Sequence, residues 1–520
     1  MKTMKYIKQS LFAFSAIGIS IIWNGCTSSF DDLNTNPDAT TKVTPALLAT
    51  KVILDHVKSA SSDNNEFMCK RMFWGEQMDN YQYNRVEKGS FSAIQGLTNA
   101  QKMVELASES NKDAYTGLYY YLKGWAFYRT TMDMGDIPYS EALQVNEFRY
   151  PKYDEQKEVF KGILDDLEQA DSHFAKATEG ISGDPFYNGD PAKWRKATNV
   201  LRLKVLMALQ KRADDTPELQ IKEKFAQIVK EGNLFEGNDD NLQVTYSNKD
   251  GQKNPFHQDL TRSINVYAGT PTLIDPLPQY KDYRLFSYFA PMQALTDPIY
   301  LPKGETLLEK NDWNAYQGVE AAGLFNTEQK KISNKMHCRP NDIYRTDYVG
   351  VPSIRLGYAD MNFVLAEAVE RGWISGSAQN YYEEGIRASF EFVRTTVSSP
   401  EYNQGMTITD EYITQYLKGE DVAYATNGTS LDRLKQIWMQ AFLASYFHLA
   451  WDSYYDYRRT GYPELPINPE TNLNDDKYKI PVRWLYPESE TNYNKEQLIN
   501  AVNRQWGGSE DVNKIMWIIK

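Results

Sequence analysis

Helical periodicity is the feature that most constrains the fold of this chain. Between Ala114 and Met134, large side chains recur with the i, i+3, i+4, i+7 spacing of one helix face. These positions are Leu118, Tyr121, Leu122, Trp125, Tyr128 and Met132. A segment of this length and period predicts a long helix packed along one side. Because similar patterns recur along the chain, the sequence predicts an all-α dominated fold.

The other predicted helices follow from cap residues and apolar spacing. Thr44-Pro45 and Asp190-Pro191 each place a capping side chain before a proline in the first helical position. The predicted helices begin at Thr44 (to about Ser59), Asp154, Asp190, Glu218 (to Lys230, before Gly232), Ser353 (to Arg371) and Ala378 (to Thr396). A last one, Ser430 to Arg458, would have 29 residues and a length of about 44 Å.

One pair of predicted helices has the spacing of a tetratricopeptide unit. Counting from Ala366, Ala378 follows 12 residues later, Tyr382 16 later and Gly385 19 later. The 34-residue unit places small residues and one aromatic ring at these offsets, where its two helices cross. Gly124 is the candidate start of a second unit. We therefore expect a tetratricopeptide-like helical-repeat scaffold, with an ordinary helical hairpin as the alternative.

The stretch from about 233 to 347 lacks this periodicity. It is rich in Gly, Pro, Asn and Asp and carries many aromatic residues without a clear period. A long irregular region within a folded protein is typical of functional loops, and the aromatic residues argue against disorder. We expect residues 44–520 to form a single helical domain with this region as a loop-rich insertion. We also expect a few short strands, one of them at Tyr478–Tyr486.

The first 43 residues read as an export segment followed by a tether. Lys2, Lys5 and Lys8 precede an uncharged, mostly apolar run, Leu11 to Trp23, which is too short to span a membrane and fits a signal peptide over residues 1–25. Gly25-Cys26 then resembles a bacterial lipobox, although Trp23 and Asn24 depart from its usual residues. We expect lipidation at Cys26, because acyl chains anchor a protein stably, with residues 26–43 as a flexible tether. A plain secretory signal with an incidental cysteine is the alternative.

Composition excludes several classes of function. The 520 residues contain 57 Lys and Arg against 69 Asp and Glu, a net charge of −12, which argues against nucleic-acid binding. The mean hydropathy of −0.60 excludes a polytopic membrane protein. Cys69 and Cys338 are too few and too far apart in sequence for a disulfide framework. Export would permit a bridge between them, but buried free thiols are expected.

No catalytic or metal-binding motif is present in the sequence. The chain lacks HExxH, GxSxG, Walker A and GxGxxG patterns. His337-Cys338 has no neighbours at metal-ligand spacing. Asp239-Asp240 offers oxygen ligands for a structural Ca²⁺ but lacks the EF-hand pattern, so neither a metal nor another cofactor is expected. A glycosidase would need two facing carboxylates, to which nothing in the sequence points.

Several blocks, taken together and in order, resemble the SusD/RagB family of nutrient-binding outer-membrane lipoproteins. The blocks include Gly124-Trp125-Ala126-Phe127, Gly135-Asp136-Ile137-Pro138-Tyr139, Tyr187-Asn188-Gly189-Asp190-Pro191, Ala359-Asp360-Met361-Asn362-Phe363, Tyr457-Arg458-Arg459-Thr460-Gly461-Tyr462-Pro463 and Ile480-Pro481-Val482-Arg483-Trp484. The resemblance implies a cell-surface protein, anchored to the outer membrane by Cys26, that binds glycans without chemistry. It also implies a partner, a SusC-like TonB-dependent transporter, on which the protein acts as a lid.

Two aromatic clusters are the candidate ligand sites, because aromatic faces pack against sugar rings while polar side chains orient hydroxyls. The first comprises Trp74, Gln77, Asn80, Tyr81 and Tyr83, and the second Tyr288, Tyr300, Asn311, Trp313 and Tyr316. Each ring can instead fill a seam between helices. We expect at least one of Trp74 and Trp313 to contact ligand.

Three other functions remain open at this point. The same scaffold could bind peptides, as the RagB branch does, or carry a surface glycoside hydrolase, or serve as an assembly scaffold for proteins. We rank these after glycan capture, and in that order. The sequence predicts no enzyme.

Overall fold

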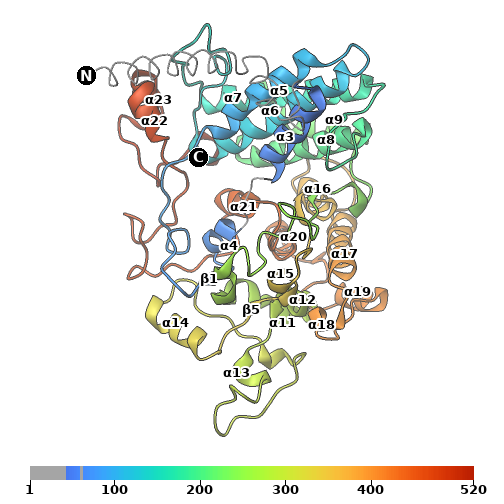
Figure 1. The fold of residues 1–520 in the computed structure, drawn as a ribbon, viewed down its shortest axis with the longest axis vertical. Coiled ribbons are helices and arrows are strands. Elements are labelled where there is room, and N and C mark those ends of the chain that lie inside the picture. The colour runs from blue at the N-terminus through green and yellow to red at the C-terminus, as the bar shows by residue number, and fades with distance from the viewer. Residues whose placement is uncertain (1–42, 59–62) are drawn as a thin grey trace, which may run out of the picture. The chain divides into compact units, whose positions relative to one another are not determined.

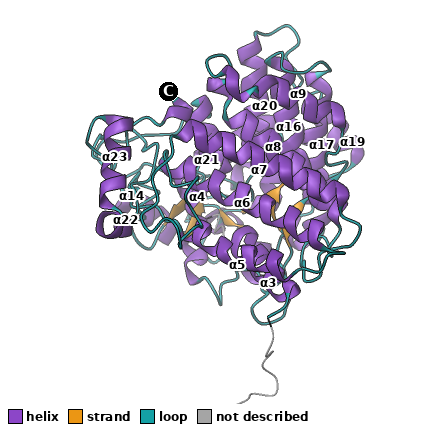
Figure 2. Cartoon of the chain, turned by 90° about the horizontal axis from the view of Figure 1, so that it is seen from above, coloured by secondary structure: helices purple, strands orange, loops and turns teal. Residues whose placement is uncertain are grey.

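Packed helices form most of the molecule, as the periodicity predicts. The computed structural model describes residues 43–58 and 63–520 (Figure 1). The signal peptide, Cys26 and nearly all of the tether lie outside the described residues. Figure 2 shows helices throughout and only small strands among the loops. The prediction of an all-α dominated fold with short strands is confirmed. None of the helices in the described ranges is long and apolar enough to cross a membrane.

The N-terminal half of the described chain is a series of helices, each packed on the next (Figure 1, blue to green). They are α3 (Pro45–Ile53), α5 (Ser92–Leu106), α6 (Lys112–Met134), α7 (Gln156–Lys176), α8 (Pro191–Ala208) and α9 (Ile221–Glu231). A short α4 (Asp63–Met68) lies between α3 and α5. Gly124 explains the close contact of α6 with α7, because a Cβ at this position would lie 2.6 Å from Cδ2 of Leu167.

The predicted tetratricopeptide-like pair forms α16 (Tyr358–Glu370) and α17 (Ala378–Thr396), which pack on each other and on α20 (Ser430–Ala444). Ala366 and Tyr382 are buried in this seam. A Cβ on Gly385 would lie 2.7 Å from Cε1 of Phe363. The small residues thus stand where the helices cross, as their spacing predicts.

The region from 233 to 347 consists of short elements joined by loops. Its helices are α10 (Pro271–Ile274), α11 (Pro276–Tyr280), α12 (Arg284–Tyr288), α13 (Gln293–Thr296), α14 (Phe325–Ser333) and α15 (Asp342–Thr346). Its strands take part in three antiparallel pairs: β1 (Met72–Trp74) with β3 (Tyr267–Gly269), β2 (Leu242–Val244) with β6 (Ser353–Leu356), and β4 (Phe289–Ala290) with β5 (Arg339–Pro340). In the first pair, Phe73 lies opposite Ala268.

The predicted 29-residue helix at Ser430–Arg458 is wrong. It is divided into α20 and α21 (Asp452–Thr460), and Phe447, Leu449 and Ala450 between them have positive φ angles of 57°, 60° and 48°. Tertiary hydrogen bonds replace helical ones here. The Phe447 amide donates to Glu66 Oε1 (3.0 Å) and the Leu449 amide to the Ile354 carbonyl (2.8 Å).

Other predicted elements also differ from the structure. Residues Ser353–Leu356 pair with β2 as a strand instead of opening a helix. Asp154 does not cap α7, because its carboxylate accepts hydrogen bonds from the amides of Tyr139 and Ser140. Tyr478–Tyr486 is not a strand, and its only β-type contact within the described chain is an isolated bridge between Leu485 and Lys88.

The remaining helices are α18 (Pro400–Asn403), α19 (Asp410–Tyr416), α22 (Glu488–Tyr493) and α23 (Lys495–Trp506). The helix expected at Glu218–Lys230 begins at Ile221, after a 3₁₀ turn at Pro217–Leu219. It ends at Gly232, which adopts the left-handed conformation that caps helices.

Candidate functional site

A cavity of about 390 Å³ opens where the π-helical turn Leu54–Lys58, α5 and α6 meet the segment that joins α20 to α21. Five aromatic side chains line it, and we call it the aromatic pocket: Tyr81, Trp125, Trp451, Tyr455 and Trp484. Polar side chains complete the lining: Asp55, His56, Asn64, Lys88, Ser90, Arg129 and Asp133. A concave site with aromatic walls and a few polar groups has the general form of a small-molecule or oligosaccharide site.

Contacts between the rings fix the geometry of the aromatic pocket. The rings of Trp451 and Trp484 meet edge to face with centroids 5.0 Å apart, and Tyr81 lies 5.3 Å from Trp451. The Trp484 indole N–H donates to the Tyr81 hydroxyl (3.4 Å). Tyr81 and Trp451 are half-buried, so parts of their rings remain open to the cavity, whereas Trp484 is buried.

Local structure explains how Tyr81 and Trp451 reach the cavity. Tyr81 stands in the loop after β1, where Lys70 donates to the carbonyls of Tyr81 (3.3 Å) and Gln82 (2.5 Å). Trp451 stands in the break between α20 and α21, directly after the left-handed Leu449 and Ala450. A continuous helix would place Trp451 elsewhere, so the break itself creates this wall of the pocket.

A buried ionic network supports the wall formed by Trp125 and Tyr455. The Arg129 guanidinium lies over the rings of Trp125 (4.9 Å) and Tyr455 (5.6 Å) and pairs with Asp452 (2.6 Å). Lys204 of α8 joins Asp452 (2.7 Å) to Asp360 (2.5 Å) of α16. The network connects four helices behind the pocket, and paired charges of this kind hold side chains in one arrangement.

Asp133 is the polar group with the most distinctive environment in the aromatic pocket. Its Oδ1 accepts the Tyr455 hydroxyl (2.6 Å), and its backbone carbonyl accepts the Trp484 amide (2.9 Å). Burial raises the pKa of Asp133 to about 6, against the lowering effects of the Tyr455 hydrogen bond and of Arg458 and Arg129. The Asp133 carboxyl therefore changes its charge near pH 6.

The structure distributes the first predicted cluster over different environments. Tyr81 lines the aromatic pocket, and Gln77 and Asn80 are exposed. Trp74 is half-buried with its ring against Tyr267, and its indole N–H finds no acceptor among the described residues. Tyr83 is a core residue, with its hydroxyl donating to the Gly323 carbonyl (3.2 Å).

The second predicted cluster lies apart from the aromatic pocket. Tyr288 and Tyr316 are buried, and their hydroxyls donate to the carbonyls of Leu443 (3.1 Å) and Lys310 (2.8 Å). Trp313 is half-buried against Phe286, at 4.6 Å between centroids, while Tyr300 and Asn311 are exposed. Of the ten predicted residues, Tyr81 alone lines the aromatic pocket. Ligand contact by any of the ten stays a prediction.

Sequence reasoning missed Trp125, Trp451, Tyr455 and Trp484. Trp125 and Trp451 both fall on predicted helix faces, where a ring normally fills a seam. Trp484 belongs to one of the blocks that carry the family resemblance, and it lies in neither predicted ligand cluster. Only the fold brings these distant segments together.

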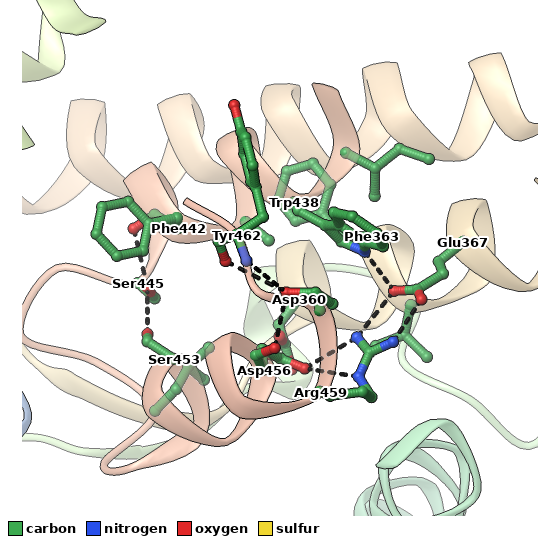
Figure 3. A pocket seen from close by; sticks show the side chains of 15 residues that line it. Asp360, Phe363, Glu367, Trp438, Phe442, Ser445, Ser453, Asp456, Arg459 and Tyr462 are labelled. Carbon is green, nitrogen blue, oxygen red and sulfur yellow. Dashed lines mark hydrogen bonds and ion pairs between the residues drawn. The ribbon is translucent and has the colours of Figure 1, made fainter. Parts of the chain in front are cut away.

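A second, narrower cavity of about 40 Å³ lies between α16, α20 and α21 (Figure 3). Its polar groups are bonded to one another. Arg459 pairs with Glu367 (2.5 Å) and Asp456 (3.0 Å), and the Trp438 indole N–H donates to Glu367 (2.9 Å). This cavity is therefore a packed seam that joins the helices, with its charged groups already engaged.

No metal site is assembled in the described part of the chain, where no three metal-ligating side chains gather. Asp240 instead binds Lys196 (3.0 Å) and the Glu236 amide (2.9 Å). Cys69 and Cys338 are free and buried, as expected, and burial raises the pKa of both thiols to about 12.

Comparison with known proteins identifies the family. Residues 37–487 match a family model described as "Starch-binding associating with outer membrane". No significant match was found among curated proteins.

Solved structures give the same assignment. A SusD homolog from Bacteroides fragilis NCTC 9343 is 42% identical, with a TM-score of 0.86, over 92% of this chain and all of that one. An outer membrane protein from Bacteroides vulgatus ATCC 8482 is 30% identical (TM-score 0.82), again over 92% and 100% of the two chains. A chitin-binding protein shares the fold at 23% identity (TM-score 0.71), with the same coverage. The chain therefore belongs to the SusD-like family of outer-membrane nutrient-binding proteins.

Proposed function

We propose that this protein captures glycan chains at the cell surface in its aromatic pocket and delivers them to a SusC-like TonB-dependent transporter. The pocket itself carries the proposal. It combines aromatic rings with hydroxyl-binding side chains, the combination that recognises sugars. The family description as starch-binding supports a carbohydrate ligand, and a chitin-binding protein has the same fold.

The charges that line the pocket favour an uncharged glycan. Asp55 and Asp133 balance Lys88 and Arg129. Three of these charges are also paired: Asp55 with Lys51 (2.8 Å), Lys88 with Glu488 (3.2 Å) and Arg129 with Asp452 (2.6 Å). No excess of one sign is left within the described lining to select an acidic or a basic sugar.

Anchoring at Cys26 in the outer membrane is part of this proposal. The tether after Cys26 would hold the described residues at the surface, next to the transporter. Lipidation is tested by growth with a labelled fatty acid, in which the label should enter the chain and be lost in Cys26→Ser.

A binding panel tests the ligand class. The chain that begins at Thr27 is mixed with soluble polysaccharides, oligosaccharides and mixed peptides. We expect retention on one class of glycan without its breakdown, and a loss of retention in Trp451→Ala. Tyr493→Ala removes a ring that is 75% exposed and outside the pocket, and it should bind like the parent. Binding to peptides alone would contradict the proposal.

Glycan hydrolysis is the alternative that a specific observation supports, because two carboxylates, Asp55 and Asp133, line the same cavity. The same panel of polysaccharides, oligosaccharides and peptides tests for hydrolysis. Release of reducing sugar that is lost in both Asp55→Asn and Asp133→Asn would show an enzyme.

A further inference from the structure

A third cavity, of about 80 Å³, lies among α11, α17, α20 and the residues that follow α21. We call it the tyrosine pocket. Its walls include Tyr280, Tyr382, Asp421, Lys435, Met439 and Tyr462. None of these residues lines the aromatic pocket.

Opposite charges line the tyrosine pocket without pairing. Within residues 43–58 and 63–520, neither Asp421 nor Lys435 takes part in an ion pair, although both are exposed and face the same cavity. The Lys435 ammonium instead lies 5.9 Å from the centroid of the Tyr462 ring. The cavity thus offers an acceptor and a donor that the protein itself leaves unused.

Two tyrosine hydroxyls are free in the same way. Tyr280 and Tyr462 are half-buried, and the described chain supplies no hydrogen-bond partner to either hydroxyl. Burial raises the pKa of Tyr280 to about 12, so its hydroxyl is a neutral donor in a partly desolvated place. Neither hydroxyl is fully buried, so a bound hydroxyl group can reach both of them.

The frame of the tyrosine pocket is held by hydrogen bonds. The Tyr382 hydroxyl donates to the Val422 carbonyl (2.8 Å), beside Asp421. The Gln436 side chain donates to the Ala423 carbonyl (3.1 Å) and accepts the Ala425 amide (3.0 Å). The loop that carries Asp421 is therefore fixed against α17 and α20 before any ligand arrives, which lowers the entropic cost of binding.

We infer that the tyrosine pocket is a second binding site that takes one polyhydroxylated ring, such as a single unit of a glycan. The rings of Tyr280 and Tyr462 offer apolar faces, and the donors and acceptors of the pocket match hydroxyl groups. The volume exceeds what one water molecule needs, so a group larger than water fits. A second site would raise the avidity for a long chain without new contacts at the first. The inference shares its ligand class with the proposed function but does not require the aromatic pocket.

A local probe tests this inference. We would place 3-fluorotyrosine at position 462 in the chain from Thr27 onward and follow its ¹⁹F resonance during titration with glucose, galactose, mannose, xylose and N-acetylglucosamine. We expect a saturable shift with at least one sugar. It should persist in Trp451→Ala and weaken at least tenfold in the double variant Asp421→Ala/Lys435→Ala.

Matched variants separate binding from folding. Lys418→Ala/Glu420→Ala removes the same charges from exposed positions of the same segment outside the cavity, and it should leave the titration unchanged. Tyr280→Phe keeps the ring and removes only the hydroxyl, so it should weaken the shift without unfolding.

The outcomes distinguish this inference from the proposed function. If no sugar shifts the resonance while Trp451→Ala abolishes glycan retention, the second site is overturned and the proposed function stands. If a sugar shifts the resonance but glycan retention does not depend on Trp451, the second site stands and glycan capture in the aromatic pocket is overturned. A shift produced only by the mixed peptides overturns the sugar assignment of this pocket.

Discussion

The Arg129 guanidinium and the Asp452 carboxylate are 2.6 Å apart and both largely buried at the wall of the aromatic pocket. Arg129 belongs to α6 and also covers Trp125 and Tyr455, while Asp452 directly follows Trp451 in the chain. One ion pair therefore links the two segments that supply most of the aromatic wall.

Breaking this pair should weaken both stability and binding. In Arg129→Met, Asp452 keeps only Lys204 as its ion-pair partner among the described residues, and removing one member of a buried pair costs about 3–5 kcal/mol. We expect a lower free energy of unfolding in denaturant titration and a loss of glycan retention. Arg129→Lys keeps the charge but loses the planar contact with the rings, so it should retain more stability than binding. Unchanged binding in Arg129→Met would show that the pair does not position the rings.

Asp133 should make stability depend on pH. Its folded-state pKa of about 6 lies above the ordinary value of 3.8, so stability that is present below pH 3.8 is lost as the pH rises through 6. Relative to the parent, Asp133→Asn should gain about 2 kcal/mol in free energy of unfolding between pH 4 and pH 8. The measurement is denaturant unfolding of both proteins at each pH.

The exposed Asp475 provides the control for this experiment. Asp475→Asn should show the same pH dependence as the parent. Equal curves for Asp133→Asn and the parent would mean that Asp133 is not the group that titrates.

Gly385→Ala should destabilise the helical scaffold. The new methyl group would lie 2.7 Å from the Phe363 ring, and overpacking of this kind costs about 1–3 kcal/mol. This cost opposes and should exceed the gain of about 1 kcal/mol that alanine brings to a helix. Gly96→Ala is the matched control, because its nearest contact would be an ordinary 3.4 Å from His56. Thermal unfolding should show a lower Tm for Gly385→Ala and an unchanged or higher Tm for Gly96→Ala.

Three tryptophans should differ in their effect on glycan retention. Trp451→Ala removes a wall of the aromatic pocket and should cause the greatest loss. Trp74→Ala and Trp313→Ala test the sequence-based prediction that at least one of these rings contacts ligand, with Tm lowered by only a few degrees. Retention and Tm are measured for all three. A collapse in Tm with unchanged retention would assign that ring to the core.

Repeating patterns made the helical scaffold predictable from the sequence. Ala378–Thr396 forms the helix that its pattern predicts, and Asp190 caps α8 through the Ala192 amide (2.8 Å). Such features depend on neighbours three or four residues away, which the sequence displays directly. The same holds for Gly124 and Gly385, whose positions indicate where helices cross.

The candidate site was much less predictable. Tyr83 belongs to the same sequence cluster as Tyr81, and Tyr288 belongs to a similar one. Nevertheless Tyr83 and Tyr288 are buried, and only Tyr81 reaches the aromatic pocket. The burial of a ring depends on which distant segments cover it, and nothing in its local sequence records them.

Short-range spacing and ordered blocks are enough to specify the helical class, the crossing points of the helix pairs and the resemblance to the SusD/RagB family. The end of α20 depends instead on long-range contacts. There, Glu66 and Ile354 bind the amides of Phe447 and Leu449 and thereby stop the helix before Trp451. These partners are more than ninety residues away in the chain. Hydrogen bonds over such distances outweigh local helix propensity, and they placed the ring that completes the aromatic pocket.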